Sequence, residues 1–95
     1  MPELVLSPEA ELDLLEIWLY IAEDSPLNAD RFLDKLNEKA QKLAEFGDMG
    51  VDRPELGKGL KCFPVDRYVL FYRSTEYGAE LVRVLASSRD SRLVF

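Results

Sequence analysis

Residues 59–73 read GLKCFPVDRYVLFYR, a run of aromatic and β-branched residues interrupted by one short polar break. This pattern predicts a β-hairpin with strands at Leu60–Val65 and Tyr68–Arg73, joined by a turn at Asp66 and Arg67. A third strand is expected over Glu80–Ser88, after a second turn through Thr75-Glu76-Tyr77-Gly78. The three strands would form an antiparallel meander.

Both faces of this meander are expected to be apolar. Residues two apart share a face of a strand, so the return strand divides into Tyr68, Leu70 and Tyr72 against Val69, Phe71 and Arg73. The same alternation in the third strand separates Val82, Val84 and Ala86 from Leu81, Arg83 and Leu85. Helices on one side cover one face only. The second face, ringed by Arg67, Arg73 and Arg83, is therefore the candidate functional surface.

Two helices are expected before the meander. A short strand at Glu3–Leu6 precedes Ser7-Pro8, and serine before proline is a helix start signal that recurs at Ser25-Pro26. The helices would run from Pro8 to about Asp24 and from Pro26 or Asn28 to about Phe46. Their short connection makes them an antiparallel hairpin, and a loop over Gly47–Lys58 follows. The predicted fold class is α+β.

The first helix has an unusual distribution of residues. Its apolar side chains form two adjoining stripes, so it is expected to contact two neighbours. One stripe contains Leu14, Ile17, Trp18 and Ile21, and the other contains Leu12, Leu15, Leu19 and Ala22. The other side carries only acidic residues, among them Asp13, and is expected to be a solvated surface.

Composition indicates one domain over residues 1–95, because a chain of 95 residues with 47% apolar residues can form a single core. One cysteine excludes an internal disulfide. The first residues lack a signal-peptide pattern and no apolar run could span a bilayer, so we expect a cytoplasmic protein without membrane contact.

Charge is unevenly distributed along the chain. Residues 1–52 hold 13 acidic and 4 basic side chains, whereas residues 53–95 hold 5 acidic and 8 basic, so a net charge of −6 divides into −9 and +3. An acidic chain is a poor general binder of nucleic acid, because that affinity comes mainly from lysine and arginine at phosphates. We expect no direct sequence-specific binding of nucleic acid.

The sequence offers little catalytic chemistry. It contains no histidine, which removes the commonest general base and metal ligand, and we expect no catalytic residue, metal or cofactor. Cys62 is interpreted as a small buried apolar residue.

The whole pattern of strand, two helices and arginine- and tyrosine-rich meander resembles the RelE/ParE toxin superfamily. The resemblance covers nearly the entire chain and is strongest to the ParE branch. It rests on residues 59–73, on the Pro-Glu-Leu-Gly loop from Pro54 to Gly57, on Val82-Arg83-Val84-Leu85, and on the pair Arg89 and Asp90.

The resemblance implies a toxin of a type II toxin-antitoxin system. A ParE-like toxin would poison DNA gyrase through protein contacts, without being an enzyme, and would form a hetero-oligomer with a ParD-like antitoxin. The alternative is a ribosome-dependent mRNA endoribonuclease of the RelE type, which would need clustered basic residues and a late tyrosine. The last tyrosine here is Tyr77, in a predicted turn, and this weakens the ribonuclease interpretation. A third hypothesis is an inactive relic that still binds its antitoxin.

The predicted partner-binding residues are arginines of the meander and of the segment after it, together with two aromatic residues of the return strand. For the arginines, a structural role of covering apolar sheet surface is an equal alternative. The set comprises Arg67, Tyr68, Phe71, Arg73, Arg83 and Arg89. The apolar residues Leu93, Val94 and Phe95 are expected either to dock on this face or to be displaced from it by a partner.

Overall fold

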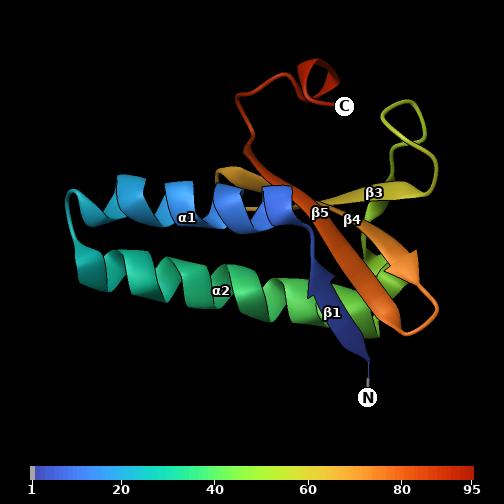
Figure 1. Cartoon of the computed structure of the whole chain (residues 1–95), viewed down its shortest axis with the longest axis horizontal. Helices are drawn as coiled ribbons and strands as arrows, with labels where there is room; N and C mark the ends of the chain where they lie inside the picture. Colours follow the sequence, from blue (N-terminus) through green and yellow to red (C-terminus); the bar gives the residue numbers. More distant parts are fainter. Residues whose placement is uncertain (1) are drawn as a thin grey trace.

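A five-stranded mixed sheet packs one face against a pair of antiparallel helices (Figure 1). The computed structural model describes residues 2–95. Its elements in chain order are β1 (Glu3–Leu6), α1 (Pro8–Ala22), α2 (Pro26–Glu45), β2 (Val51–Asp52), β3 (Leu60–Val65), β4 (Tyr68–Thr75) and β5 (Gly78–Ala86), with short 3-10 turns at Gly47–Met49 and Ser91–Leu93. The spatial strand order is β1-β5-β4-β3-β2, in which β1 is parallel to β5 and the other pairs are antiparallel.

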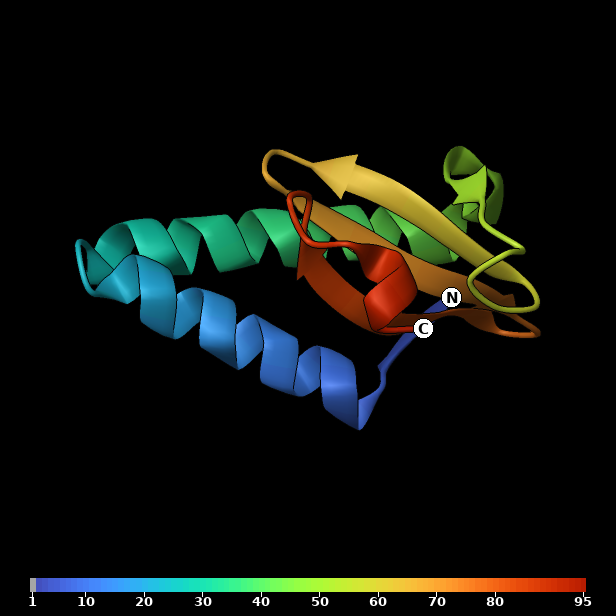
Figure 2. The same cartoon turned by 90° about the horizontal axis from the view of Figure 1, so that it is seen from above.

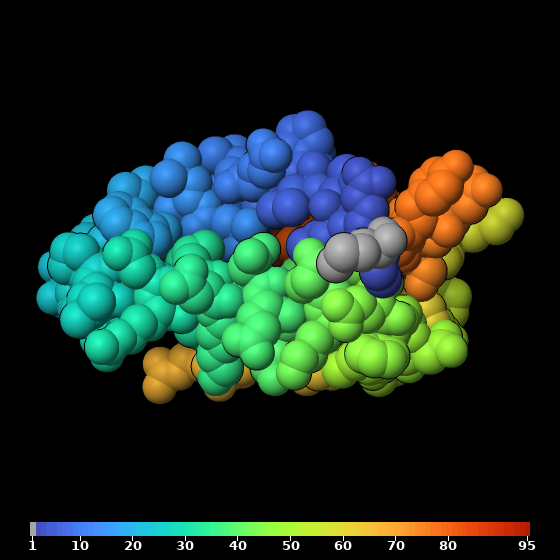
Figure 3. Space-filling model, turned by 90° about the horizontal axis from the view of Figure 1, so that it is seen from below, coloured from blue at the N-terminus to red at the C-terminus, as the bar shows by residue number. Residues whose placement is uncertain are grey.

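Both helices begin where the serine-proline pairs predict. The Ser7 hydroxyl accepts a hydrogen bond from the Ala10 N–H at 3.0 Å, and the Ser25 hydroxyl accepts one from the Asn28 N–H at 3.2 Å. Each serine thereby satisfies a backbone donor that the first turn leaves free, and the following proline occupies the first helical turn. The predicted helical hairpin is confirmed, and Figure 3 shows its two helices side by side over one face of the molecule.

The main core lies between this hairpin and the sheet. Leu36 and Leu43 of α2 are almost fully buried against Leu70 and Tyr72 of β4 and Leu81 of β5. The Tyr72 hydroxyl accepts a hydrogen bond from the Gly50 N–H at 2.8 Å and donates one to the Gly47 carbonyl at 2.7 Å. The buried Tyr72 side chain therefore also stabilises the turn that follows α2.

The sheet is larger than the predicted meander. β1 joins it as a parallel edge strand beside β5, and β2 forms within the predicted loop by pairing Val51 with Cys62 and Asp52 with Lys61. The third strand spans Gly78–Ala86 instead of Glu80–Ser88. Its earlier start reflects the tight two-residue turn at Glu76 and Tyr77, which extends the hairpin to the pair Thr75 and Gly78. The predicted α+β fold class is confirmed.

A β-bulge in β5 makes the predicted alternation of that strand wrong. Tyr72 pairs with Leu81 while its neighbour Phe71 pairs with Arg83, so Val82 is an extra residue without a partner. As a result Leu81 and Val84 both face the helices, whereas Val82 joins the opposite face. Single-strand periodicity cannot reveal the extra residue, because it depends on the register with β4.

Two predictions about α1 also need correction. Asp13 is buried and not solvated, because its carboxylate binds β5. The predicted contact of this helix with two neighbours, α2 and β5, is confirmed, but the first apolar stripe makes it, and Leu12, Leu15 and Leu19 of the second stripe are exposed. Neither helix of residues 2–95 combines the length and apolar character needed to cross a bilayer.

Candidate partner-binding surface

The face of the sheet turned away from the helices, called here the open face, carries a second apolar cluster. Leu60, Phe71 and Leu85 are buried in it, with Cys62, Val69 and Val82 packed around them. This cluster is buried by segments outside helices α1 and α2. Leu56, from the loop before β3, and Val94, from the last turn of the chain, both pack against this cluster.

Val94 and Phe95 dock on this open face, as one of the two sequence alternatives predicts, whereas Leu93 of the same segment is exposed. The ring of Phe95 lies 5.0 Å from the ring of Phe71, centroid to centroid, at an interplanar angle of 53°. Figure 2 shows the C-terminal turn lying over the sheet. Phe71 is only 3% exposed beneath the C-terminal turn, so a partner can contact it only after that turn moves away.

A cavity of about 360 Å³ remains beside the tail on the open face. Its floor is apolar, with Val69, Phe71 and Leu85, and its walls include Arg53 and Arg89. Two cationic side chains around an apolar floor suit a partner that offers apolar groups together with a carboxylate or another anionic group.

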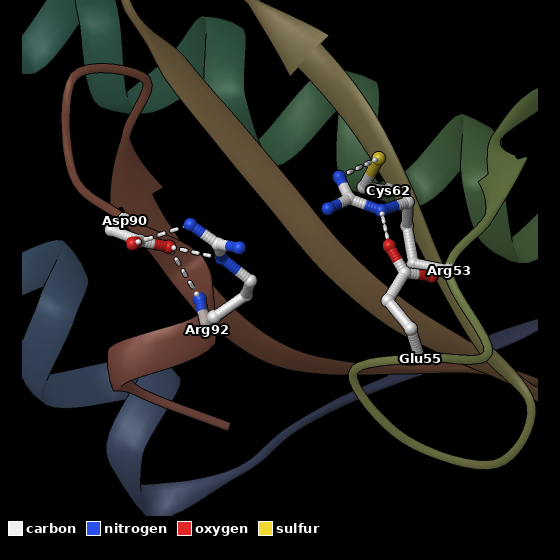
Figure 4. Close-up of polar contacts among 5 residues, drawn as sticks. All are labelled: Arg53, Glu55, Cys62, Asp90 and Arg92. Carbon is white, nitrogen blue, oxygen red and sulfur yellow. Dashed lines mark hydrogen bonds and ion pairs between the residues drawn. The ribbon is translucent and has the colours of Figure 1, made fainter.

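Arg53 is held in place over this cavity (Figure 4). Its Nε donates to Glu55 Oε2 at 2.8 Å, and its Nη1 lies 3.9 Å from Cys62 Sγ. The hydrogen bond to Glu55, followed by the contact with Cys62, raises the pKa of the Arg53 guanidinium above its ordinary value. Sequence reasoning missed Arg53, although its position directly before the Pro54–Gly57 loop was a usable signal.

Three of the predicted partner-binding residues gather at the end of the sheet where β3 turns into β4. Arg67 lies in that turn, and its carbonyl accepts a hydrogen bond from the Ser87 N–H at 2.7 Å, which brings the segment leading to Arg89 alongside. Arg67 and Arg89 are exposed, and no ion pair to either occurs within residues 2–95. Tyr68 lies on the helix side of this end, with its ring 5.5 Å from that of Phe32. We call Arg67, Tyr68 and Arg89 the turn-end cluster.

The remaining predicted arginines are engaged by the protein itself. Arg73 lies on β4, five residues beyond Tyr68 and therefore about 17 Å along the strand from the turn end. Its Nε donates to the Lys58 carbonyl at 3.0 Å. Arg83 donates from Nε and Nη2 to the two Asp13 carboxylate oxygens at 2.7 and 2.9 Å. This pairing with Asp13 raises the pKa of Arg83. Arg83 therefore does not belong to a free arginine ring around the open face.

The last turn contains a further local ion pair (Figure 4). Arg92 Nε lies 3.1 Å from Asp90 Oδ1, and the Arg92 backbone N–H donates to the same oxygen at 3.0 Å. These hydrogen bonds hold the pKa of Asp90 below its ordinary value. They shape the segment that carries Val94 and Phe95 onto the sheet. Within residues 2–95 no group of three or more histidine, cysteine or carboxylate side chains is placed to bind a metal ion.

The fold places the chain in a known structural class. It superposes on a solved structure described as the chromosomal ParDE TA system from P. aeruginosa with a TM-score of 0.74, over 90% of this chain and 96% of that chain. At 19% sequence identity this likeness establishes the fold. A comparison with curated proteins found no match.

The family follows from the sequence itself. Residues 4–91 match the family model described as ParE toxin of type II toxin-antitoxin system, parDE. The chain belongs to this family of ParE toxins, and the resemblance noted from the hairpin and the Pro-Glu-Leu-Gly loop is confirmed.

Proposed function

We propose that this ParE toxin acts by inhibiting DNA gyrase through protein contacts and that a cognate antitoxin neutralises it. The family match supports the toxin role, and gyrase is the target implied by the resemblance to the ParE branch. Because gyrase is a cytoplasmic enzyme, the proposed site of action is the cytoplasm.

The observation that carries the proposal is the turn-end cluster beside the cavity on the open face. Arg67 and Arg89 are exposed and make no ion pair within residues 2–95, while Arg89 also borders an apolar floor. Interfaces between proteins are enriched in arginine and aromatic residues, which combine large contact area with directional hydrogen bonds. The same surface suits an antitoxin segment that carries apolar side chains and carboxylates, so neutralisation would occur by covering it.

The experiment compares two activities of the purified protein. We expect it to inhibit gyrase supercoiling, or to trap cleaved DNA, at concentrations that leave messenger RNA intact in a translating extract. Arginine can stabilise negative charge but stays protonated, so arginine alone is a poor proton shuttle for RNA cleavage.

Two outcomes would contradict the proposal. Codon-positioned cuts in messenger RNA that Arg67→Ala abolishes would establish ribonuclease action of the RelE type. Inactivity in both assays, with tight binding of the antitoxin, would indicate an inactive relic.

A further inference from the structure

The side of α1 that faces away from the core carries a stripe of three exposed leucines. Leu12, Leu15 and Leu19 are 56%, 53% and 53% exposed. At about 100° of rotation per residue they fall within about 60° of the helix circumference, opposite the buried residues Ala10 and Ile17. We call these three leucines the outer leucine stripe.

Single exposed leucines are common on protein surfaces, but this arrangement differs from scattered exposure. A helix at the surface of a protein normally has one apolar side, and a helix that is apolar on opposite sides is normally covered on both. None of the three leucines belongs to either apolar cluster of residues 2–95. One of the two apolar sides of α1 therefore has no cover within residues 2–95.

The charged side chains of α1 itself are all of one sign. Glu9, Glu11 and Glu16 are exposed on α1, and Glu23 and Asp24 follow its last turn. The first basic residue of the whole sequence is Arg31, so α1 has no basic side chain. An occupant would therefore meet leucines bordered by carboxylates and by no competing cation on the same helix.

We propose that the outer leucine stripe is a docking site for a basic amphipathic helix of a protein partner. Leucine or similar side chains of that helix would pack on Leu12, Leu15 and Leu19, and its flanking lysines or arginines would meet the carboxylates. A second copy of this chain fits less well, because a symmetric contact would bring two acidic α1 helices together. This inference rests on α1 alone and is independent of the proposed action on gyrase.

The test uses the full chain and a defined probe. The probe is a synthetic helical peptide of about 18 residues, with leucines along one side and lysines at the flanking positions, and a matched peptide carries glutamate in place of lysine. Binding is measured by fluorescence anisotropy at low and at high salt. The double variant Leu15→Gln/Leu19→Gln removes the apolar contact without changing charge. The matched control is Leu93→Gln, because this leucine lies outside the stripe, in the C-terminal turn, and is 84% exposed.

We expect the lysine peptide to bind the unmodified chain and the Leu93→Gln variant equally, and the double variant at least about tenfold more weakly. The glutamate peptide should not bind, and high salt should weaken binding of the lysine peptide. Because the substituted leucines are exposed, thermal unfolding followed by circular dichroism should be unchanged. Glu16→Lys gives a second test through charge and should also weaken binding.

Three results would overturn the inference. Equal affinity of the unmodified chain and the double variant, or no binding of the lysine peptide, would show that the stripe is not a site for a basic helix. A dimer in sedimentation that the double variant converts to a monomer would assign the stripe to a second copy of this chain.

Discussion

Asp13 connects the first helix to the edge of β5 through three hydrogen bonds. Its carboxylate accepts from Nε and Nη2 of Arg83 and from the Val84 backbone N–H at 2.9 Å. β1 pairs with β5 only as far as Leu81, so the Val84 N–H lies beyond the last backbone partner on that side. A helix side chain therefore completes the hydrogen bonding of this strand edge.

Removing the Asp13 carboxylate should destabilise the fold. The side chain is 8% exposed, so Asp13→Ala would leave the Arg83 guanidinium and the Val84 N–H without their acceptor. We expect a loss of about 3 kcal/mol in the free energy of unfolding, measured with urea. Glu16→Ala on the same helix, at an exposed carboxylate, should change it by less than about 0.5 kcal/mol. Equal effects of the two substitutions would show that the contact with β5 contributes little.

Tyr72 predicts a pH dependence at the alkaline end. Burial raises the pKa of its phenol above the ordinary value of 10.0, so the folded state favours the neutral form. This contribution to stability is fully present below that ordinary value and is lost as the pH rises through the folded pKa. Tyr72→Phe should cost about 1–3 kcal/mol at neutral pH, because Gly50 N–H and Gly47 carbonyl lose their partner.

The alkaline test compares unfolding of the chain and its variants at neutral pH and above pH 10. Tyr72→Phe should lose less stability than the unmodified chain as the pH rises, whereas Tyr77→Phe, at an exposed tyrosine, should behave like the unmodified chain. If all three lose the same stability, the buried phenol is not the group responsible.

At the scale of elements, the sequence predicted those helix and strand boundaries that depend on residues close together in the chain. The two serine-proline pairs gave both helix starts, and the run from Leu60 to Val65 gave the full extent of β3. Features that depend on distant pairing were missed. The bulge at Val82 arises from the register with β4, and the burial of Asp13 arises from its position beside β5.

The candidate site likewise contains residues that local sequence predicted and contacts that it could not predict. The arginines of the turn-end cluster could be named from their place next to the hairpin. Sequence could not reveal that Arg83 is paired with Asp13, 70 residues away, or that Phe71 lies beneath Phe95. Those contacts depend on where α1 and the C-terminal turn pack.

The C-terminal turn should contribute measurable stability through one aromatic contact. Phe95 is 36% exposed and packs on Phe71, whereas Leu93 in the same turn is 84% exposed. Phe95→Ala should lower the free energy of unfolding by about 1 kcal/mol, and Leu93→Ala should leave it nearly unchanged. Equal effects on the unfolding midpoint would mean that the tail is not packed on the sheet in solution.

At the scale of the whole molecule, charge is separated along the sequence into an acidic half that forms the helices and a basic half that forms most of the sheet. This division predicts that an acidic antitoxin segment binds at the sheet and not at the hairpin. The double reversal Arg67→Glu/Arg89→Glu should weaken the complex with the cognate antitoxin by at least about tenfold, measured by calorimetric titration. Arg31→Glu, at an exposed arginine of α2, should have little effect, and an equal loss from Arg31→Glu would reject this placement.

Inhibition of gyrase supercoiling by the purified chain and its arginine variants tests whether the toxin acts on gyrase through the turn-end cluster. We expect the unmodified chain and Arg31→Glu to inhibit at similar concentrations, and Arg67→Glu/Arg89→Glu to require at least about tenfold more protein. Circular dichroism should show the same unfolding for all three, since both substituted turn-end arginines are exposed. Absence of inhibition by the unmodified chain, or equal inhibition by the Arg67→Glu/Arg89→Glu variant, would contradict action on gyrase through the turn-end cluster.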